Sequence, residues 1–270
     1  MGEPALQAAQ AVARACGLPC DDAVVLGGGS NALVHLRPAP VVARVMTATA
    51  LLHDDVESWL SREVAVGAFL GERGLAVAPT DLMPPGPDQR DGLWMTFWEY
   101  VPHDGRGDEV GASELGRSLR SLHAALAEFP GELEPLLGVQ EDILLLLDEL
   151  QPPPESLRAT LSELTPPVFD SRLPAQPLHG DTGLSNVLRT DKGLLWNDFE
   201  DVCSGPVDWD VAGLVVSARV RGRDEAFVEE FLSAYGGPGL SELADFIAAH
   251  ELYTAVWQAY AQKKRRDRLP

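Results

Sequence analysis

The chain of 270 residues carries 41 acidic and 21 basic side chains, so its net charge is −20, and 45% of its residues are hydrophobic. This composition predicts a folded protein with a substantial core; the negative charge disfavours nucleic acid as a partner, yet is compatible with a cationic substrate. No apolar run is long enough to span a membrane and no signal peptide is evident, so we expect a cytosolic protein without a membrane partner.

The first hundred residues predict a small α+β lobe. Apolar residues recur at helical spacing over 5–16 and again over 55–73. Stretches with strand character, separated by Gly- and Pro-rich turns, cover residues 23–26, 32–36, 41–46, 80–83 and 93–100. Three to five strands with one long helix make a lobe of this kind, which we place at residues 1–101.

The remainder of the chain predicts a mostly helical lobe, residues 102–270. The turn-rich segment 101–107 is interpreted as the connection between the lobes. Apolar residues at helical spacing predict helices over 111–128, 141–150, 155–164, 208–219, 224–235 and 240–262. Short strands are expected around residue 181 and at 194–196.

The strongest chemical signal lies between residues 178 and 201, where Asp181, Asn186 and Asp198 follow one another at short spacings. Asp181 can orient an attacking hydroxyl and accept its proton. Asn186 and Asp198 carry oxygen ligands of the kind that holds Mg²⁺ against ATP phosphates. Any one of these residues can instead cap a turn. The three spacings together, in a strand–loop–strand context, favour metal-assisted phosphoryl transfer.

Two neighbours of this segment are candidates for supporting roles. His179 precedes the loop, and a scaffolding contact with the loop backbone or the metal-binding Asp is favoured over proton transfer. Glu200 follows Asp198 by two residues. It can assist the metal, point into a substrate pocket or lie on the surface, and the sequence leaves these alternatives open.

These residues resemble the aminoglycoside phosphotransferase and choline-kinase-like family of small-molecule kinases. The resemblance is sharpest over 177–215 and rests on His179-Gly-Asp181 with Asn186, Asp198-Phe-Glu200 and Gly205-Pro-Val-Asp208-Trp-Asp210. It implies a two-lobed protein-kinase-like α+β fold, with a small antiparallel-sheet N-lobe and a larger, mostly helical C-lobe. It also implies ATP and Mg²⁺ as cofactors, and transfer of the γ-phosphoryl group to a hydroxyl of a small molecule.

The same resemblance implies roles in nucleotide binding for the first lobe. Ser30 and Asn31, at the end of a Gly-rich turn, would face the triphosphate. Arg44 occupies the strand position where the family usually has a lysine for the α- and β-phosphates. Arginine keeps the charge and can bind phosphate through two donors. Glu63, on the following helix, would be its ion-pair partner.

The strand 94–101 resembles the hinge that binds adenine through its backbone. Glu99 and Val101 would supply these hydrogen bonds, and Phe97 would lie behind the base. Farther along the chain, Asp208 would brace the catalytic loop. An N-cap of the following helix is the default role for Asp208 or Asp210.

The family builds its acceptor pocket from the C-terminal helices and the segment after the catalytic loop. The candidates are acidic or aromatic: Asp201, Trp209, Glu229, Tyr253 and Trp257. An aromatic face can bind a cation, although aromatic residues at helical spacing are more often core residues. The acceptor therefore stays open among aminoglycoside-like antibiotics, amino sugars, amino alcohols, nucleosides and sugars.

Two other classes of function are weighed against a kinase. A non-catalytic nucleotide-binding protein is favoured by Arg44 in place of lysine, but disfavoured by the joint presence of Asp181, Asn186 and Asp198. A metal-dependent hydrolase would use His179 with Asp181 and Asp198. With a single histidine near the cluster, it would be poorly supplied with ligands.

Overall fold

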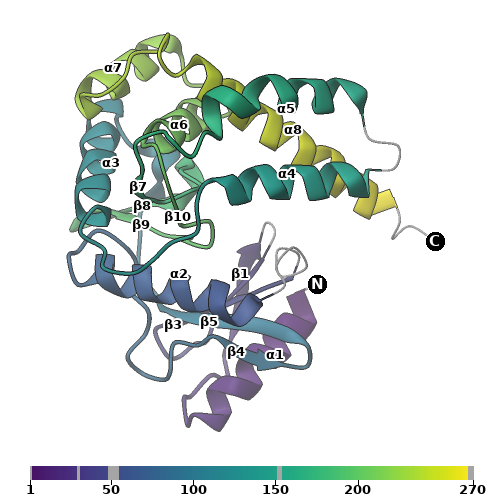
Figure 1. Ribbon diagram of the computed structural model, residues 1–270. Coiled ribbons are helices and arrows are strands. Elements are labelled where there is room, and N and C mark those ends of the chain that lie inside the picture. Colours follow the sequence, from purple (N-terminus) through teal and green to yellow (C-terminus); the bar gives the residue numbers. More distant parts are fainter. Residues whose placement is uncertain (1, 29–30, 48–54, 151–153, 267–270) are drawn as a thin grey trace. The chain divides into compact units, whose positions relative to one another are not determined.

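The computed structural model describes residues 2–28, 31–47, 55–150 and 154–266 (Figure 1). Its contacts divide the chain into two compact units. The first comprises Met1–Arg106 and Val187–Asp201, and the second comprises Gly107–Asn186 and Val202–Pro270. The lobes predicted at 1–101 and 102–270 differ from these units chiefly in the placement of residues 187–201.

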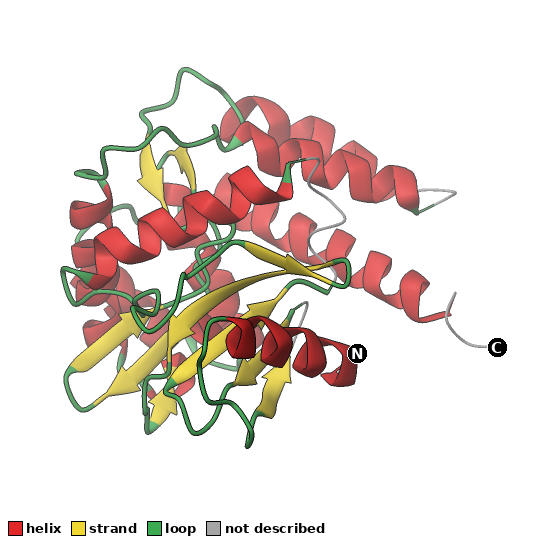
Figure 2. Ribbon diagram, turned by 90° about the horizontal axis from the view of Figure 1, so that it is seen from below, coloured by secondary structure: helices red, strands yellow, loops and turns green. Residues whose placement is uncertain are grey.

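The first unit is built on a five-stranded antiparallel sheet in the order β1-β2-β3-β5-β4. Its strands are β1 (Val24–Gly28), β2 (Ala32–His35), β3 (Val41–Val45), β4 (Asp88–Arg90) and β5 (Leu93–Glu99). Helix α1 (Gly2–Ala15) covers one face of this sheet and α2 (Val56–Gly71) lies on the other (Figures 1 and 2).

Side chains along β3 alternate between the two faces of the sheet. Val41, Ala43 and Val45 are fully buried in the hydrophobic cluster that includes the apolar side of α1. Successive strand residues point to opposite faces, so Arg44 points away from that cluster. There it meets Glu63 of α2.

A second, three-stranded sheet explains why residues after 187 belong to the first unit. Strands β8 (Val187–Thr190) and β9 (Gly193–Trp196) form a hairpin, and β6 (Gly105–Arg106) pairs with β8. The backbone of Trp196 exchanges hydrogen bonds with Leu75 and Val77. The residues that follow β9 are thereby held against the first unit.

The second unit is mostly helical. Helix α3 (Ala112–Leu126) packs against α7 (Glu225–Tyr235), while α8 (Ala244–Arg266) packs against α4 (Leu137–Glu149), α5 (Glu155–Val168) and α6 (Asp208–Val220). Strands β7 (Gln176–Leu178) and β10 (Cys203–Gly205) form an antiparallel pair. Short 3-10 helices cover Gly107–Glu109 and Leu184–Asn186. Within the described ranges, no helix combines the length and apolarity needed to cross a membrane.

Several element boundaries differ from those predicted. Helix α4 begins before residue 141, and α5 continues through Pro167 to Val168, because the N–H of Phe169 still donates to the carbonyl of Thr165. Residues 80–83 form no strand, although the N–H of Thr80 donates to Phe97. Strand β4 consists of exposed polar residues, and so it lacks the apolar alternation that would have revealed it.

A buried histidine joins α8 to α6. The ring of His250 lies 3.8 Å from that of Trp209, and its Nε2 lies 2.9 Å from the Trp209 carbonyl oxygen. Because a carbonyl only accepts, Nε2 carries the proton of a neutral ring. Burial lowers the pKa of His250 to about 4.

This burial predicts a loss of stability in acid. The unfolded chain takes up a proton at His250 below the ordinary pKa of 6.5, whereas the folded protein resists protonation until about pH 4. The free energy of unfolding should therefore fall as the pH drops through this range, by up to about 3 kcal/mol. The variant His250→Gln can still donate to the carbonyl but does not titrate. Urea unfolding between pH 7 and 4 should show a smaller loss for the variant; equal losses would contradict the assignment.

Candidate active site

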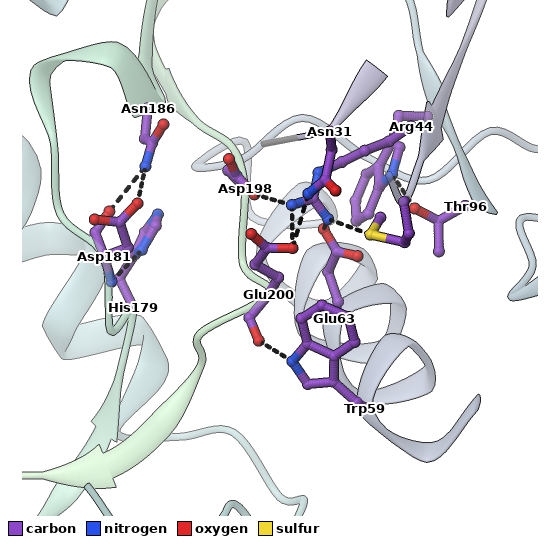
Figure 3. A network of polar contacts seen from close by, with 12 residues as sticks. Asn31, Arg44, Trp59, Glu63, Thr96, His179, Asp181, Asn186, Asp198 and Glu200 are labelled. Atoms are coloured by element: carbon purple, nitrogen blue, oxygen red, sulfur yellow. Dashed lines mark hydrogen bonds and ion pairs between the residues drawn. The ribbon is translucent and has the colours of Figure 1, made fainter. Parts of the chain in front are cut away.

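The predicted catalytic loop, residues 179–186, follows β7 in the second unit and is closed on itself by hydrogen bonds (Figure 3). Nδ2 of Asn186 donates to the backbone oxygen of Asp181 at 2.9 Å and to its carboxylate Oδ2 at 3.0 Å. The N–H of Asp181 donates to Nδ1 of His179 at 3.3 Å. His179 is fully buried whereas Asp181 is exposed, so the loop has a buried start and presents the Asp181 carboxylate to solvent. The loop-backbone contact predicted for His179 is confirmed.

Asn186 is oriented in a way that suits a metal ligand. Its amide nitrogen is turned toward Asp181. Among the described residues, no hydrogen bond to its Oδ1 is found. Carbonyl oxygen is a ligand type that Mg²⁺ accepts. The geometry of this side chain therefore fits the predicted role, which stays a prediction.

A buried carboxylate braces the loop, and it is Asp210 rather than the predicted Asp208. Asp210 is fully buried and accepts from the backbone N–H of His179 at 2.8 Å and of Gly180 at 2.9 Å. Residues two apart on a helix face nearly opposite directions, so only one of the two can reach the loop. Helix α6 begins at Asp208 itself, and no side chain caps it, so the N-cap prediction is also wrong.

Asp210 contacts His123 of α3, and His123 in turn contacts Tyr235 of α7. Nε2 of His123 lies 2.9 Å from its Oδ2, and Nδ1 of the same ring lies 2.9 Å from the hydroxyl of Tyr235. Burial raises the pKa of Asp210, but hydrogen bonding to His123 and the charges of His123 and His179 outweigh it, so the pKa lies below its ordinary value. No pattern in the sequence points to this role of His123, because a histidine among leucines in a helix carries no sign of a distant partner.

Trp209 is part of this brace, which corrects its prediction as an acceptor wall. The side chain is fully buried, and its indole N–H donates to the carbonyl of Gly180 at 2.8 Å. The hydroxyl of Thr182 donates to the carbonyl of Asp210. A ligand in solvent finds no exposed face of this indole to stack on.

The first unit contains a separate cluster centred on Arg44, whose side chain is only 7% exposed (Figure 3). Its Nη1 donates to Glu63 Oε1 at 2.9 Å, so the predicted ion pair forms. Its Nη2 lies 2.5 Å from Asp198 Oδ1 and 2.5 Å from Glu200 Oε2. One guanidinium thus serves three carboxylates.

The excess of negative charge shifts the ionisation of this cluster. Burial lowers the pKa of Arg44, but Asp198, Glu200 and Glu63 together raise it above its ordinary value. Burial also raises the pKa of Glu63, assisted by Asp198 and Glu200 and opposed by Arg44. Oε2 of Glu63 has no hydrogen-bond partner among the described residues. The cluster therefore has capacity for further positive charge.

Asp198 is the partly exposed member of this cluster, with a side chain 33% accessible. Its backbone is left-handed, with φ of 69°, a conformation that costs a non-glycine residue about 1–3 kcal/mol and that clusters at functional sites. A carboxylate held in this way offers the oxygen ligand that Mg²⁺ prefers. Within the described ranges, no group of three or more His, Cys, Asp or Glu side chains is arranged as a metal site by itself.

Glu200 is buried, which removes the surface alternative left open by the sequence. Its Oε2 accepts from Nδ2 of Asn31 at 3.1 Å, and its backbone oxygen accepts from the indole of Trp59 at 2.6 Å. Asn31 is thereby tied to the cluster. Ser30, predicted beside it, lies outside the described residues.

The hinge residues lie on two different sides of β5. Phe97 is fully buried in the hydrophobic cluster shared with α1 and pairs with Ala43, so it points away from the face of Arg44. The prediction that Phe97 lies behind the adenine base is wrong, because the alternation of side chains along β5 directs Phe97 into the core shared with α1. Trp94, Thr96 and Trp98 are the β5 residues on the face of Arg44.

The backbone at Glu99 and Val101 is compatible with the predicted adenine contacts. The N–H of Tyr100 donates to Pro40, so the neighbouring residue Glu99 directs its groups to the opposite edge. Its N–H is already bound to the carbonyl of Ala78, which leaves the Glu99 carbonyl as the group for a base. No partner of the Val101 N–H is found among the residues that the structure describes.

The remaining acceptor candidates are accessible. Glu229 is exposed on α7, and Asp201, Tyr253 and Trp257 are partly exposed. The rings of Tyr253 and Trp257 meet edge to face, with centroids 6.3 Å apart. These two aromatics of α8 are thus not core residues, and the role of the four residues stays a prediction.

Comparison with known proteins bears on the family and the fold. The model of the phosphotransferase enzyme family matches residues 24–246. Among solved structures, the choline kinase LicA from Streptococcus pneumoniae is similar, with a TM-score of 0.72 and 17% identity over 95% of this chain and 91% of that chain. An aminoglycoside-3'-phosphotransferase of type VIII aligns with a TM-score of 0.68 and 19% identity over 93% and 99%.

A third similar structure is the amicoumacin kinase hAmiN in complex with AMP-PNP, Ca²⁺ and Ami. Its TM-score is 0.70 and its identity 13%, over 93% of this chain and 86% of that chain. These likenesses confirm the two-lobed, protein-kinase-like α+β fold. With the family model matched over most of its length, the chain belongs to the phosphotransferase enzyme family.

Proposed function

We propose that this protein uses ATP and Mg²⁺ to phosphorylate a hydroxyl group of a small molecule. The observation that carries the proposal is the exposed carboxylate of Asp181, held on a braced loop by Asn186 and Asp210. Phosphoryl transfer requires alignment and charge neutralisation more than covalent chemistry. A fixed carboxylate at the loop tip meets the first requirement, because it can orient the acceptor hydroxyl and take its proton.

Mg²⁺ is the second part of the proposal. Asn186, in the second unit, and Asp198, in the first, each offer an oxygen ligand of the type this ion binds. When bound, the ion would neutralise charge on the phosphate oxygens. The likeness to a kinase structure that contains AMP-PNP and Ca²⁺ supports the use of a nucleotide with a divalent cation.

Nucleotide binding is assigned to the first unit. The carbonyl of Glu99 and the N–H of Val101 would bind adenine. Asn31 and Arg44 would serve the phosphates, with Ser30 as a further candidate from the sequence. Arginine keeps its charge and can offer two parallel donors to phosphate, which supports Arg44 in the place of lysine.

The acceptor is proposed to be a small hydroxylated molecule, with cationic compounds as the first candidates. The net charge of −20 attracts cations, and Asp201, Glu229, Tyr253 and Trp257 are accessible acidic or aromatic groups. Aminoglycoside-like antibiotics, amino sugars and amino alcohols meet this description. A coupled assay of ADP release over these classes, with nucleosides and neutral sugars for comparison, tests the proposal.

A non-catalytic nucleotide-binding protein is the alternative function. It is favoured by the saturation of Arg44 with three carboxylates. Nucleotide binding without ADP release over the whole panel would support this alternative. Release of phosphate from monoesters without ATP would instead favour a hydrolase.

The first prediction concerns Asp181. The variant Asp181→Asn keeps the shape of the side chain but cannot accept a proton, so kcat should fall by about 10²–10⁴-fold while nucleotide affinity stays nearly unchanged. Steady-state kinetics and calorimetric binding of AMP-PNP measure the two quantities. Asp191→Asn, at an exposed turn, is the matched control. Full activity of Asp181→Asn would exclude the assigned role.

The second prediction concerns Asp198. The variant Asp198→Asn loses an anionic ligand, so the Mg²⁺ concentration needed for half-maximal AMP-PNP binding should rise by about tenfold or more. Calorimetric titrations at several Mg²⁺ concentrations measure this shift. The Asp191→Asn control should titrate like the wild type. An unchanged Mg²⁺ requirement in Asp198→Asn would refute the assignment.

A further inference from the structure

The arrangement around Arg44 depends on the fork of a guanidinium group. One terminal nitrogen, Nη1, donates to Glu63 on α2, while the other, Nη2, lies against Asp198 and Glu200 after β9. The contacts are therefore divided between two nitrogens that point in different directions. A lysine ammonium is a compact point charge on a flexible stem, and a single nitrogen cannot reproduce this division.

Glu200 extends the same network to the nucleotide loop. Its Oε2 contacts Nη2 of Arg44 and accepts from Nδ2 of Asn31. Oδ1 of Asn31 in turn accepts from the N–H of Thr47 at 3.2 Å. The backbone oxygen of Glu200 accepts from Trp59 on α2. One buried residue thus connects the start of β2, the end of β3 and helix α2.

From these contacts we infer that Glu200 is a positioning residue, matched to the arginine at position 44, that holds Arg44 and Asn31 in place for the nucleotide phosphates. This inference rests on the proposed function and deepens it. Oε2 of Glu200 is engaged by both Arg44 and Asn31, and these two contacts are the basis of the positioning role. It follows that lysine at position 44, the usual residue of the resembled family, should not strengthen nucleotide binding by this protein.

Two variants test the matched pair. Arg44→Lys keeps the charge but loses the fork, and Glu200→Gln keeps an oxygen for Asn31 but loses the charge that pairs with Arg44. Each should raise the ATP KM and the Kd for AMP-PNP by about tenfold, the change that one charge-assisted hydrogen bond is worth. The acceptor KM should stay near wild type in both variants, and the Mg²⁺ requirement should stay near wild type in Glu200→Gln, which leaves the contact of Arg44 with Asp198 in place. The double variant should be less impaired than the sum of the two, because both remove the same contact.

A milder pair of variants guards against loss of folding. Trp59→Phe removes the indole donor to Glu200 but keeps an aromatic ring at this buried position, and it should raise the Kd for AMP-PNP in the same direction by less. Trp94→Phe is its matched control, because Trp94 packs against the same cluster of Trp59 and Leu60 without a hydrogen bond to Glu200. Melting curves and circular dichroism establish that each variant is folded.

The outcomes separate this inference from the proposed function. Wild-type nucleotide affinity in Arg44→Lys, or a Glu200→Gln defect confined to the Mg²⁺ requirement, would overturn the inference and leave the kinase assignment standing. Additive effects in the double variant would also overturn it. Failure of the wild type to bind AMP-PNP would overturn both. Raised Kd values in Arg44→Lys, Glu200→Gln and Trp59→Phe, with wild-type values in Trp94→Phe, are the expected result.

Discussion

A charge withdrawn from water has to be paired, and this constraint shapes both units of the protein. In the first unit it concerns Arg44, buried among three carboxylates, and in the second it concerns Asp210, buried among donors from α3 and the catalytic loop. Removing one partner of a buried pair typically costs about 3–5 kcal/mol. The surrounding backbone is therefore held in one arrangement, including the left-handed residue Asp198.

The Asp210 and Arg44 clusters each fix the backbone next to a carboxylate that stays accessible, Asp181 in one case and Asp198 in the other. Asp210 fixes the backbone of His179 and Gly180, and the next residue, Asp181, carries its carboxylate into solvent. In the other unit, the β8–β9 hairpin and the Trp59–Glu200 hydrogen bond hold the chain on either side of Asp198. A side chain that must act at a defined place needs this kind of immobile support, because small misplacements of a reacting group are costly.

The sequence predicted what is local and periodic. Asp181, Asn186 and Asp198 could be singled out as candidates because they are close together in the chain, and their roles stay predictions. Most helices and strands follow from apolar periodicity. The face of a strand or helix on which a residue lies was less well predicted. Phe97 lies on the opposite face of β5 from the one expected, and Asp210, not Asp208, contacts the loop. Partners distant in sequence left no signal at all. His123 and Asp210 are 87 positions apart, and Asn31 and Glu200 are 169 apart, so only the folded chain reveals these pairs.

The central claim, transfer of a phosphoryl group from ATP to a small-molecule hydroxyl, is tested most directly by ³¹P nuclear magnetic resonance of the complete reaction. The protein, ATP and Mg²⁺ are incubated with each acceptor of the panel. The account predicts that for at least one acceptor the γ-phosphate signal disappears while signals of ADP and a new phosphomonoester appear together. ATP that stays intact with every acceptor, or that yields only inorganic phosphate, would contradict it.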